Sequence, residues 1–313
     1  MSMKHHLNTV SGDPISQLAF GTMQFGGAAD QSASEAMYRA AREAGINHFD
    51  TAVGYTDGNS EKILGPMVAA ERDDIYLATK VAYKGGSGRD NIITMFDQCR
   101  SQLGVDSVDL LYLHRFDDET PLEETFSTMA ELQDAGSIRH IGVSNYAAWQ
   151  VMKAQAVAET LGTKIDVIQP MYSLVKRQSE VEIFPMAVDQ GIKVVPYSPL
   201  GGGLLTGKYA AGETGRLTDD AMYKKRYDVD WMHNCARDLS GIGSELGVHP
   251  ATLAVAWAAR HPVAPSPIIS ARSVAQLAPS LAAEGFEMDD ALYARITALS
   301  VTPAPATDRL EEA

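Results

Sequence analysis

The sequence predicts an α/β fold: a single (β/α)8 barrel with an N-terminal hairpin and a long loop after strand seven. Eight short apolar runs alternate with longer amphipathic segments. Six successive runs end at residues 51, 81, 114, 144, 171 and 198, so the steps are 30, 33, 30, 27 and 27 residues. A strand, a crossover helix and two loops need about 30 residues. Eight such units favour a closed barrel over an open doubly wound sheet, and we expect residues 1–313 to form one domain.

The expected strands are short runs rich in apolar and β-branched residues. They cover residues 18–22, 47–51, 75–81, 108–114, 140–144, 167–171, 193–198 and 266–271. Helices are expected between them, most clearly at 34–44, 122–135 and 183–190. Each of these three segments is followed by a glycine, which supplies the left-handed residue that ends a helix.

Two segments depart from the strand–helix repeat. Residues 3–17 are predicted to form a hairpin that closes the bottom of the barrel, with Gly12-Asp13-Pro14 as its turn. The stretch from 198 to 271 is much longer than one repeat and contains one expected helix, near 250–259. A long insertion at this position is a candidate functional loop.

Composition excludes several functional classes. The chain has 40 acidic and 26 basic residues, a net charge of −14, which argues against binding to nucleic acid or to an anionic membrane. No stretch of about 18 apolar residues is present, so no membrane span is expected. The N-terminus leads into no apolar run and the chain has two distant cysteines, so we expect a cytoplasmic location. The sequence does not indicate an oligomeric state.

Polar residues stand where the second, third and fourth strands end. Asp50, Lys80 and His114 end these strands, and Tyr55 lies in the loop after the second. Chemistry in such barrels takes place at the C-terminal ends of the strands. Adjacent strands lie about 4.8 Å apart, so Asp50 and Lys80 can form an ion pair. The ammonium favours the phenolate of a nearby tyrosine, and a histidine can donate a hydrogen bond to a carbonyl oxygen. Such a set can deliver a proton to a developing alkoxide.

The remaining strand ends add further polar groups. Ser144-Asn145 end strand five, Gln169 lies in strand six, and Tyr197-Ser198 end strand seven. The run Gly201-Gly202-Gly203 matches neither a P-loop nor a Rossmann fingerprint, so we interpret it as a place of close backbone approach. A metal-dependent barrel hydrolase would need clustered ligands such as HxH, and none of the eight histidines has that spacing, so no metal is expected.

Taken in order, these segments resemble the aldo-keto reductase family over nearly the whole chain. The resemblance depends on Phe49-Asp50-Thr51-Ala52 with Tyr55, Gly58-Asn59-Ser60-Glu61, Ala78-Thr79-Lys80-Val81, Leu111-Tyr112-Leu113-His114-Arg115, Ile141-Gly142-Val143-Ser144-Asn145, Gln169 with Tyr172-Ser173-Leu174, Pro196-Tyr197-Ser198-Pro199-Leu200, Thr206-Gly207-Lys208-Tyr209 and Ala271-Arg272-Ser273 with Gln276.

The resemblance implies an NADP(H)-dependent oxidoreductase, with NAD possible, that reduces aldehydes or ketones to alcohols or catalyses the reverse. It implies that Tyr55 is the general acid, that Lys80 and Asp50 tune it, and that His114 orients the carbonyl of a small-molecule substrate. The long loop after strand seven would bind the cofactor. The implied cofactor-binding residues are Ser144, Asn145, Gln169, Tyr197, Ser198, Leu200, Gly202, Lys208, Arg216, Ser270, Arg272 and Gln276. The alternative is a cofactor-sensing regulatory subunit of the same fold, as some relatives are for potassium channels.

Several positions depart from the family pattern. Thr56 replaces a glycine that usually follows the tyrosine, Ser270 replaces a glycine before Ala-Arg-Ser, and Pro279-Ser280 replace a Glu-Asn pair. No C-terminal substrate loop is evident, so other loops must form the substrate walls. The aromatic candidates for these walls are Phe25, Tyr83, Phe116, Tyr146 and Trp231.

Overall fold

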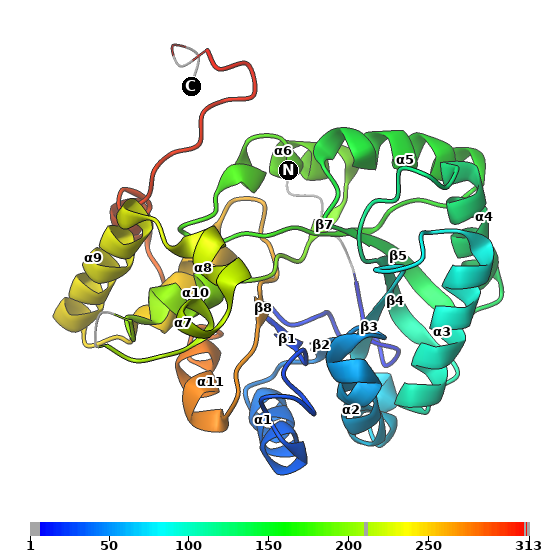
Figure 1. Ribbon diagram of the computed structural model, residues 1–313, viewed down its shortest axis with the longest axis horizontal. Helices are drawn as coiled ribbons and strands as arrows, with labels where there is room; N and C mark the ends of the chain where they lie inside the picture. The colour runs from blue at the N-terminus through cyan, green and yellow to red at the C-terminus, as the bar shows by residue number, and fades with distance from the viewer. Residues whose placement is uncertain (1–6, 210–211, 310, 312–313) are drawn as a thin grey trace.

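A parallel eight-stranded sheet forms the centre of the computed structural model, which describes residues 7–209, 212–309 and 311. The strands follow the order β7-β6-β5-β4-β3-β2-β1-β8, with every pair parallel. Their bounds are β1 (Ala19–Gly21), β2 (His48–Asp50), β3 (Tyr76–Val81), β4 (Val108–Leu113), β5 (Ile138–Ser144), β6 (Val167–Gln169), β7 (Lys193–Val194) and β8 (Ile268–Ile269). Figure 1 shows the sheet curling inside a ring of helices. The predicted (β/α)8 fold is confirmed.

Backbone hydrogen bonds close the ring between the seventh and eighth strands. The Ser266 N–H donates to the Val194 oxygen over 2.9 Å, and the Ile268 N–H donates to the Pro196 oxygen over 2.8 Å. Both β6 and β7 are shorter than expected because prolines follow them closely, Pro170 and Pro196, and proline has no N–H to donate to a neighbouring strand.

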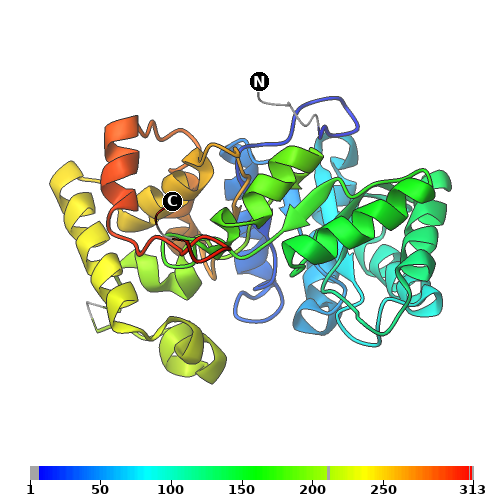
Figure 2. The same cartoon turned by 90° about the horizontal axis from the view of Figure 1, so that it is seen from above.

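The crossover helices surround the sheet (Figures 1 and 2). They are α1 (Gln31–Glu43), α2 (Asn59–Ala69), α3 (Arg89–Leu103), α4 (Leu122–Asp134), α5 (Ala148–Thr160) and α6 (Ile183–Gln190), and after β8 come α11 (Val274–Leu281) and α12 (Asp290–Thr297). The helix expected at 34–44 begins earlier, because the Asp30 side chain accepts a hydrogen bond from the Ala33 N–H and caps it. The other two expected helices agree with α4 and α6 to within one residue.

The segment between β7 and β8 holds more structure than the sequence predicted. Besides the expected α10 (Pro250–Arg260), it contains the 3-10 turn η4 (Gly201–Thr206), α7 (Arg216–Asp219), α8 (Ala221–Tyr227) and α9 (Asp230–Leu246). The prediction of one helix here was therefore wrong. The signal for α9 was present in the sequence: Met232, Cys235, Leu239 and Ile242 recur at helical spacing and are all buried.

The N-terminal hairpin covers the bottom of the barrel as expected. Asn8 pairs antiparallel with Pro14, and the Ile15 N–H donates to the Leu7 oxygen over 3.0 Å. Leu7 packs in one cluster with barrel residues that include Tyr76 and Leu110. Residues 3–6 of the predicted hairpin lie outside the described residues. That residues 1–313 form one domain stays a prediction.

Strand register places the polar side chains of the barrel in layers. His48 pairs with Tyr76 in one layer, while Asp50 and Lys80 lie nearer the C-terminal ends of their strands. Ser144 pairs with Gln169 at the same end of the barrel. Within the described part of the chain, no helix is long and apolar enough to cross a membrane, and no group of three or more His, Cys, Asp or Glu side chains could hold a metal ion.

Candidate active site

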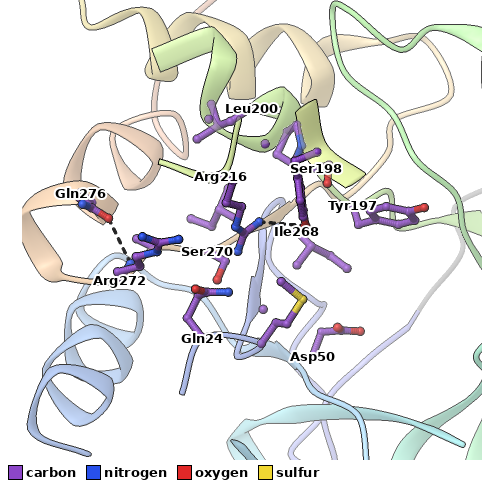
Figure 3. A pocket seen from close by; sticks show the side chains of 18 of the residues that line it. Gln24, Asp50, Tyr197, Ser198, Leu200, Arg216, Ile268, Ser270, Arg272 and Gln276 are labelled. Carbon is purple, nitrogen blue, oxygen red and sulfur yellow. Dashed lines mark hydrogen bonds between the residues drawn. The ribbon is translucent and has the colours of Figure 1, made fainter. Parts of the chain in front are cut away.

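A cavity of roughly 1320 Å³ opens at the C-terminal ends of the strands. Every site residue predicted from the sequence lines it, with the exception of Lys80, which lies buried behind Asp50. Figure 3 shows how side chains from distant segments converge there, from Asp50 on β2 to Arg272 and Gln276 near α11. The sequence therefore predicted which residues come together.

Four polar residues, Asp50, Tyr55, Lys80 and His114, gather at the base of the cavity, and we call them the polar floor. Lys80 lies at its centre. Its Nζ donates to a carboxylate oxygen of Asp50 and to the Thr51 carbonyl oxygen over 2.8 Å. It also lies 5.1 Å from the ring centroid of Tyr55, which is half-buried at the start of the turn after β2. The second carboxylate oxygen of Asp50 accepts a hydrogen bond from Gln169 Nε2 over 2.9 Å. Lys80 thus connects the carboxylate to the phenol.

Burial dominates the electrostatics of this floor. Burial raises the pKa of Asp50, whereas the charge and hydrogen bonds of its neighbours Lys80 and Gln169 act in the opposite direction. For Lys80, burial alone would lower the pKa, but attraction to Asp50 and Tyr55 outweighs it and the pKa is raised. Lys80 is therefore an ammonium group at neutral pH.

The pKa of the Tyr55 phenol shifts in a direction that the sequence does not predict. Burial raises the pKa of Tyr55 above its ordinary value, and the charge of Lys80 compensates only in part. The sequence predicts the opposite direction, with the Lys80 ammonium favouring the phenolate. The reason for the difference is desolvation, because a phenolate is disfavoured in a site shielded from water. Tyr55 is thus a protonated donor at neutral pH, with Lys80 placed to stabilise its anion.

His114 lies beside the phenol as a neutral imidazole. Its ring centroid is 5.8 Å from that of Tyr55, and the two rings meet edge to face. Burial, with a contribution from the Lys80 charge, lowers the pKa of His114 to about 3. A neutral imidazole has one N–H to donate, so this side chain can hydrogen-bond a carbonyl oxygen without adding charge.

A connected polar wall faces this floor. The Asn145 amide donates to the His114 carbonyl oxygen over 2.9 Å and accepts from the Tyr197 hydroxyl over 2.8 Å. The Ser144 hydroxyl donates to the Gln169 carbonyl oxygen over 3.0 Å. Asn145 has a φ of 59°, a left-handed conformation that asparagine tolerates better than most residues. These contacts hold the Tyr197 ring at the edge of the cavity.

The opposite end of the cavity is basic. Lys208, Arg216 and Arg272 come from the segments after β7 and β8, and none of them has an acidic side chain within 4.0 Å among the described residues. Burial and the neighbouring Arg272 charge lower the pKa of Lys208. Ser270 adds a buried hydroxyl oxygen with no hydrogen-bond partner among the described residues. These groups suit a phosphate-bearing ligand.

The glycine run brings backbone close to the same end of the cavity. Gly202 has a φ of +67°, and a Cβ there would lie 2.9 Å from the ring of Tyr223. Gly203 has a φ of +94°. Both positions need glycine for their conformation, and both line the cavity. Ser198, Leu200 and Gln276 line it as well, and Gln276 Oε1 accepts a hydrogen bond from the Arg272 N–H over 3.3 Å.

The sequence was less informative about the substrate end of the cavity. Of the five aromatic candidates, only Tyr83 lines it. Phe25 and Tyr146 are buried in the core, and Phe116 and Trp231 pack against that core. Lining residues that sequence reasoning missed include Met23, Gln24, Lys84, Arg115, Met222 and Arg226.

Comparison with known proteins agrees with this geometry. Residues 17–301 match the model of the aldo/keto reductase family. The chain is 34% identical over 290 residues to a probable voltage-gated potassium channel subunit beta of Oryza sativa subsp. japonica, covering 87% of this chain and 88% of the rice protein. It is 32% identical over 319 residues, 95% of each chain, to the uncharacterized oxidoreductase YrpG of Bacillus subtilis (strain 168). It is 33% identical over 290 residues to the aldo-keto reductase YhdN of the same bacterium, covering 85% of this chain and 84% of YhdN.

Oxidoreductases are thus among the relatives that match this chain over most of its length. The matched residues include every strand of the barrel and all the residues of the polar floor. With the family match covering most of the barrel and its cavity, the chain belongs to the aldo/keto reductase family.

Proposed function

We propose that the protein is an NADP(H)-dependent oxidoreductase that reduces aldehydes or ketones to alcohols, or catalyses the reverse, with Tyr55 as general acid. The observation that supports this most is that one ammonium group serves two neighbours. Lys80 forms an ion pair with Asp50 and also lies against the Tyr55 ring, at the floor of a large cavity. That arrangement offers a proton donor whose conjugate base is stabilised by a fixed ammonium.

A bound reduced nicotinamide would supply the hydride that the carbonyl carbon needs. The protein's own groups act on the carbonyl oxygen. The neutral His114 donates a hydrogen bond that orients and polarises the C=O bond, and Tyr55 transfers its phenolic proton to that oxygen as negative charge develops on it. Lys80 then faces the phenolate, and Asp50 keeps the ammonium oriented. In the alcohol-oxidising direction the same phenolate accepts the proton.

The residues present fit such a dinucleotide. Ser144, Asn145 and Gln169 would hold the carboxamide, and Tyr197 would stack on the nicotinamide ring. Ser198, Leu200 and Gly202 would lie near the pyrophosphate, where the left-handed glycines allow close backbone approach.

The preference for NADP(H) is proposed from the basic end of the cavity. Lys208, Arg216 and Arg272 form no ion pair within 4.0 Å among the described residues, and an extra 2′-phosphate would offset the repulsion by Arg272 and Arg216 that helps to lower the pKa of Lys208. The unpartnered hydroxyl of Ser270 would gain an acceptor or donor there, and Gln276 would meet the adenosine. NAD(H) would use the same site with fewer contacts.

The test is a turnover assay with a panel of aldehydes and ketones, each with NADPH and with NADH. We expect oxidation of NADPH with at least one aldehyde. Replacing Tyr55 by Phe should lower kcat by about 100-fold or more, because it removes the general acid while leaving the dinucleotide site intact. The matched control is Tyr293→Phe, a tyrosine of α12 that packs near Trp257 away from the cavity. A Tyr55→Phe enzyme with more than about a tenth of wild-type kcat would contradict the assignment.

A cofactor-sensing regulatory subunit is the second candidate. Its support is the match to proteins from rice and Arabidopsis thaliana that are named probable voltage-gated potassium channel subunits beta, which the chain resembles over most of its length. NADPH binding without turnover of any compound in the panel would favour it over the reductase.

A further inference from the structure

We propose that the substrate end of the cavity selects carbonyl compounds that carry an anionic group, and that Arg115 and Lys84 bind that anion. The inference rests on the proposed reductase function and deepens it by naming a substrate class. Both side chains line the cavity. They stand on the loops after β4 and β3, directly beyond the polar floor.

A row of rings leads from the proton donor to these cations. The Tyr55 ring lies 5.8 Å from His114, and His114 lies 5.0 Å from Tyr83, measured between ring centroids. The Arg115 guanidinium carbon lies 5.5 Å from the Tyr83 centroid, in a cation–π contact. A substrate whose carbonyl is held by Tyr55 and His114 can therefore extend along Tyr83 and reach Arg115 several bonds away.

The charges at this end favour an anion. No acidic side chain lies within 4.0 Å of Lys84 or Arg115 in the described ranges. Asp57 lines the cavity in the turn beside Tyr55, whereas Asp117, two residues after Arg115, does not line it and accepts hydrogen bonds from the Ser87 N–H and the Thr120 hydroxyl. Two cations without acidic partners at the mouth of a cavity are notable in a chain with a net charge of −14.

The side-chain chemistry points to a planar anion. A guanidinium presents paired N–H donors that match a carboxylate in two parallel hydrogen bonds. Contact with the Tyr83 ring limits the orientations of Arg115 before the substrate arrives, so less conformational freedom is lost on binding. Tyr83 itself is 53% exposed, so part of its ring can contact the substrate segment between carbonyl and anion. A phosphate ester would find the same cations.

The experiment compares 4-carboxybenzaldehyde with its neutral methyl ester, using kcat/KM with NADPH. We expect the wild-type enzyme to prefer the carboxylate. Replacing Arg115 by Gln should lower the carboxylate-to-ester ratio by about threefold to tenfold, as expected for a charged contact open to solvent. Lys84→Gln should have a smaller effect in the same direction. The matched control is Arg39→Gln, which removes one positive charge from the exposed surface of α1 and should leave the ratio unchanged.

A binding measurement separates the possible failures. Binding of 4-(hydroxymethyl)benzoate, followed by tryptophan fluorescence, needs no turnover and should weaken in Arg115→Gln. If neither aldehyde is reduced but this binding weakens as expected, the proposed function fails and the anion site stands. If both aldehydes are reduced with an unchanged ratio in Arg115→Gln, the anion site is wrong.

Two comparisons refine the assignment. Arg226 of α8 also lines the cavity, beside Tyr223, so Arg226→Gln should change the ratio less than Arg115→Gln. The reverse order would overturn the choice of Arg115.

Glyceraldehyde 3-phosphate, compared with glyceraldehyde, tests the phosphate source of the anion. In Arg115→Gln, the ratio of kcat/KM for glyceraldehyde 3-phosphate to that for glyceraldehyde is compared with the carboxylate-to-ester ratio. A larger fall in the phosphate ratio would identify a phosphate ester as the preferred class of substrate.

Discussion

Removing the Lys80 ammonium should destabilise the protein more than removing both members of its ion pair. Lys80 is 0% exposed, and Asp50 is 2% exposed. In Lys80→Met, the Asp50 side chain keeps only the Gln169 hydrogen bond of 2.9 Å among the described residues. Breaking a buried pair in this way costs about 3–5 kcal/mol of unfolding free energy. In the double variant Asp50→Asn/Lys80→Met no charge remains buried, so the penalty of an unpaired buried carboxylate is absent. The unfolding free energy of the double variant should therefore be higher than that of Lys80→Met by about 2 kcal/mol or more.

The pH dependence gives a second, independent measure of the same effect. In Lys80→Met, the folded-state pKa of Asp50 is expected above its unfolded value, because burial acts without the opposing ammonium. A carboxyl group with a raised folded-state pKa contributes stability at low pH that is lost as pH rises through that pKa. The deficit of Lys80→Met relative to the double variant should thus shrink as pH falls from 7 towards 4.5.

Urea unfolding of wild type, both single variants and the double variant at several pH values measures these differences. Equal stability of Lys80→Met and the double variant at pH 7 would refute the reasoning, since it would mean that the lone carboxylate carries no penalty. Activity adds a further expectation. Without Lys80, burial and the Asp50 charge both raise the pKa of Tyr55, so kcat should fall nearly as far as in Tyr55→Phe.

Two other predictions concern a buried histidine and the phosphate site. His48 is fully buried, and neither of its ring nitrogens has a hydrogen-bond partner among the described residues. Burial lowers its pKa in the folded protein to about 3. As pH falls below 6.5, His48 therefore takes up a proton in the unfolded chain before it does so in the folded protein. Wild-type stability should decline between pH 6.5 and 5 more steeply than that of His48→Gln, by up to about 1.4 kcal/mol per pH unit, and parallel urea-derived curves would contradict this. Arg272→Ala should weaken NADP(H) binding by about tenfold to 100-fold with little change for NAD(H), as measured by fluorescence titration. Arg237→Ala on α9 is the matched control, and equal losses for both cofactors would show that Arg272 does not contact the 2′-phosphate.

The barrel and its polar floor were predictable because both follow from short-range regularities. A repeat of about 30 residues reflects the length of a strand, a helix and two loops. Parallel strands that are neighbours end at the same side of the sheet, so polar residues at the ends of β2, β3 and β4 meet in space. Asp50, Lys80 and His114 could be placed from this alone.

Features that depend on solvent exposure were not predictable in the same way. Arg115 and Lys84 have the appearance of ordinary surface cations in the sequence, and only the loop geometry brings them to the cavity mouth. The direction of the Tyr55 pKa shift depends on how far water is excluded, which no spacing pattern reports. Phe25 and Tyr146 are aromatic candidates for the substrate walls in the sequence, but both are buried in the core.

Thr56 is the departure from the family pattern with the clearest physical consequence. It follows Tyr55 and has a φ of 49°, a conformation that costs a β-branched residue roughly 1–2 kcal/mol. Its hydroxyl lies 2.7 Å from the carbonyl oxygens of both Phe25 and Tyr55 and can donate its one proton to either, and the bond to Phe25 ties the turn that carries Tyr55 to the loop after β1.

Two substitutions separate the strain at Thr56 from the hydrogen bond. Thr56→Val keeps the shape and the strain but removes the hydroxyl donor that the Phe25 and Tyr55 carbonyl oxygens share, so it should lower the unfolding free energy by about 1–3 kcal/mol. Thr56→Gly loses the same bond but relieves the strain, and the gain is partly offset by the greater freedom of glycine in the unfolded chain. We therefore expect Thr56→Gly to be more stable than Thr56→Val, as measured by urea unfolding at pH 7. If Thr56→Val is the more stable of the two, the left-handed conformation is not strained.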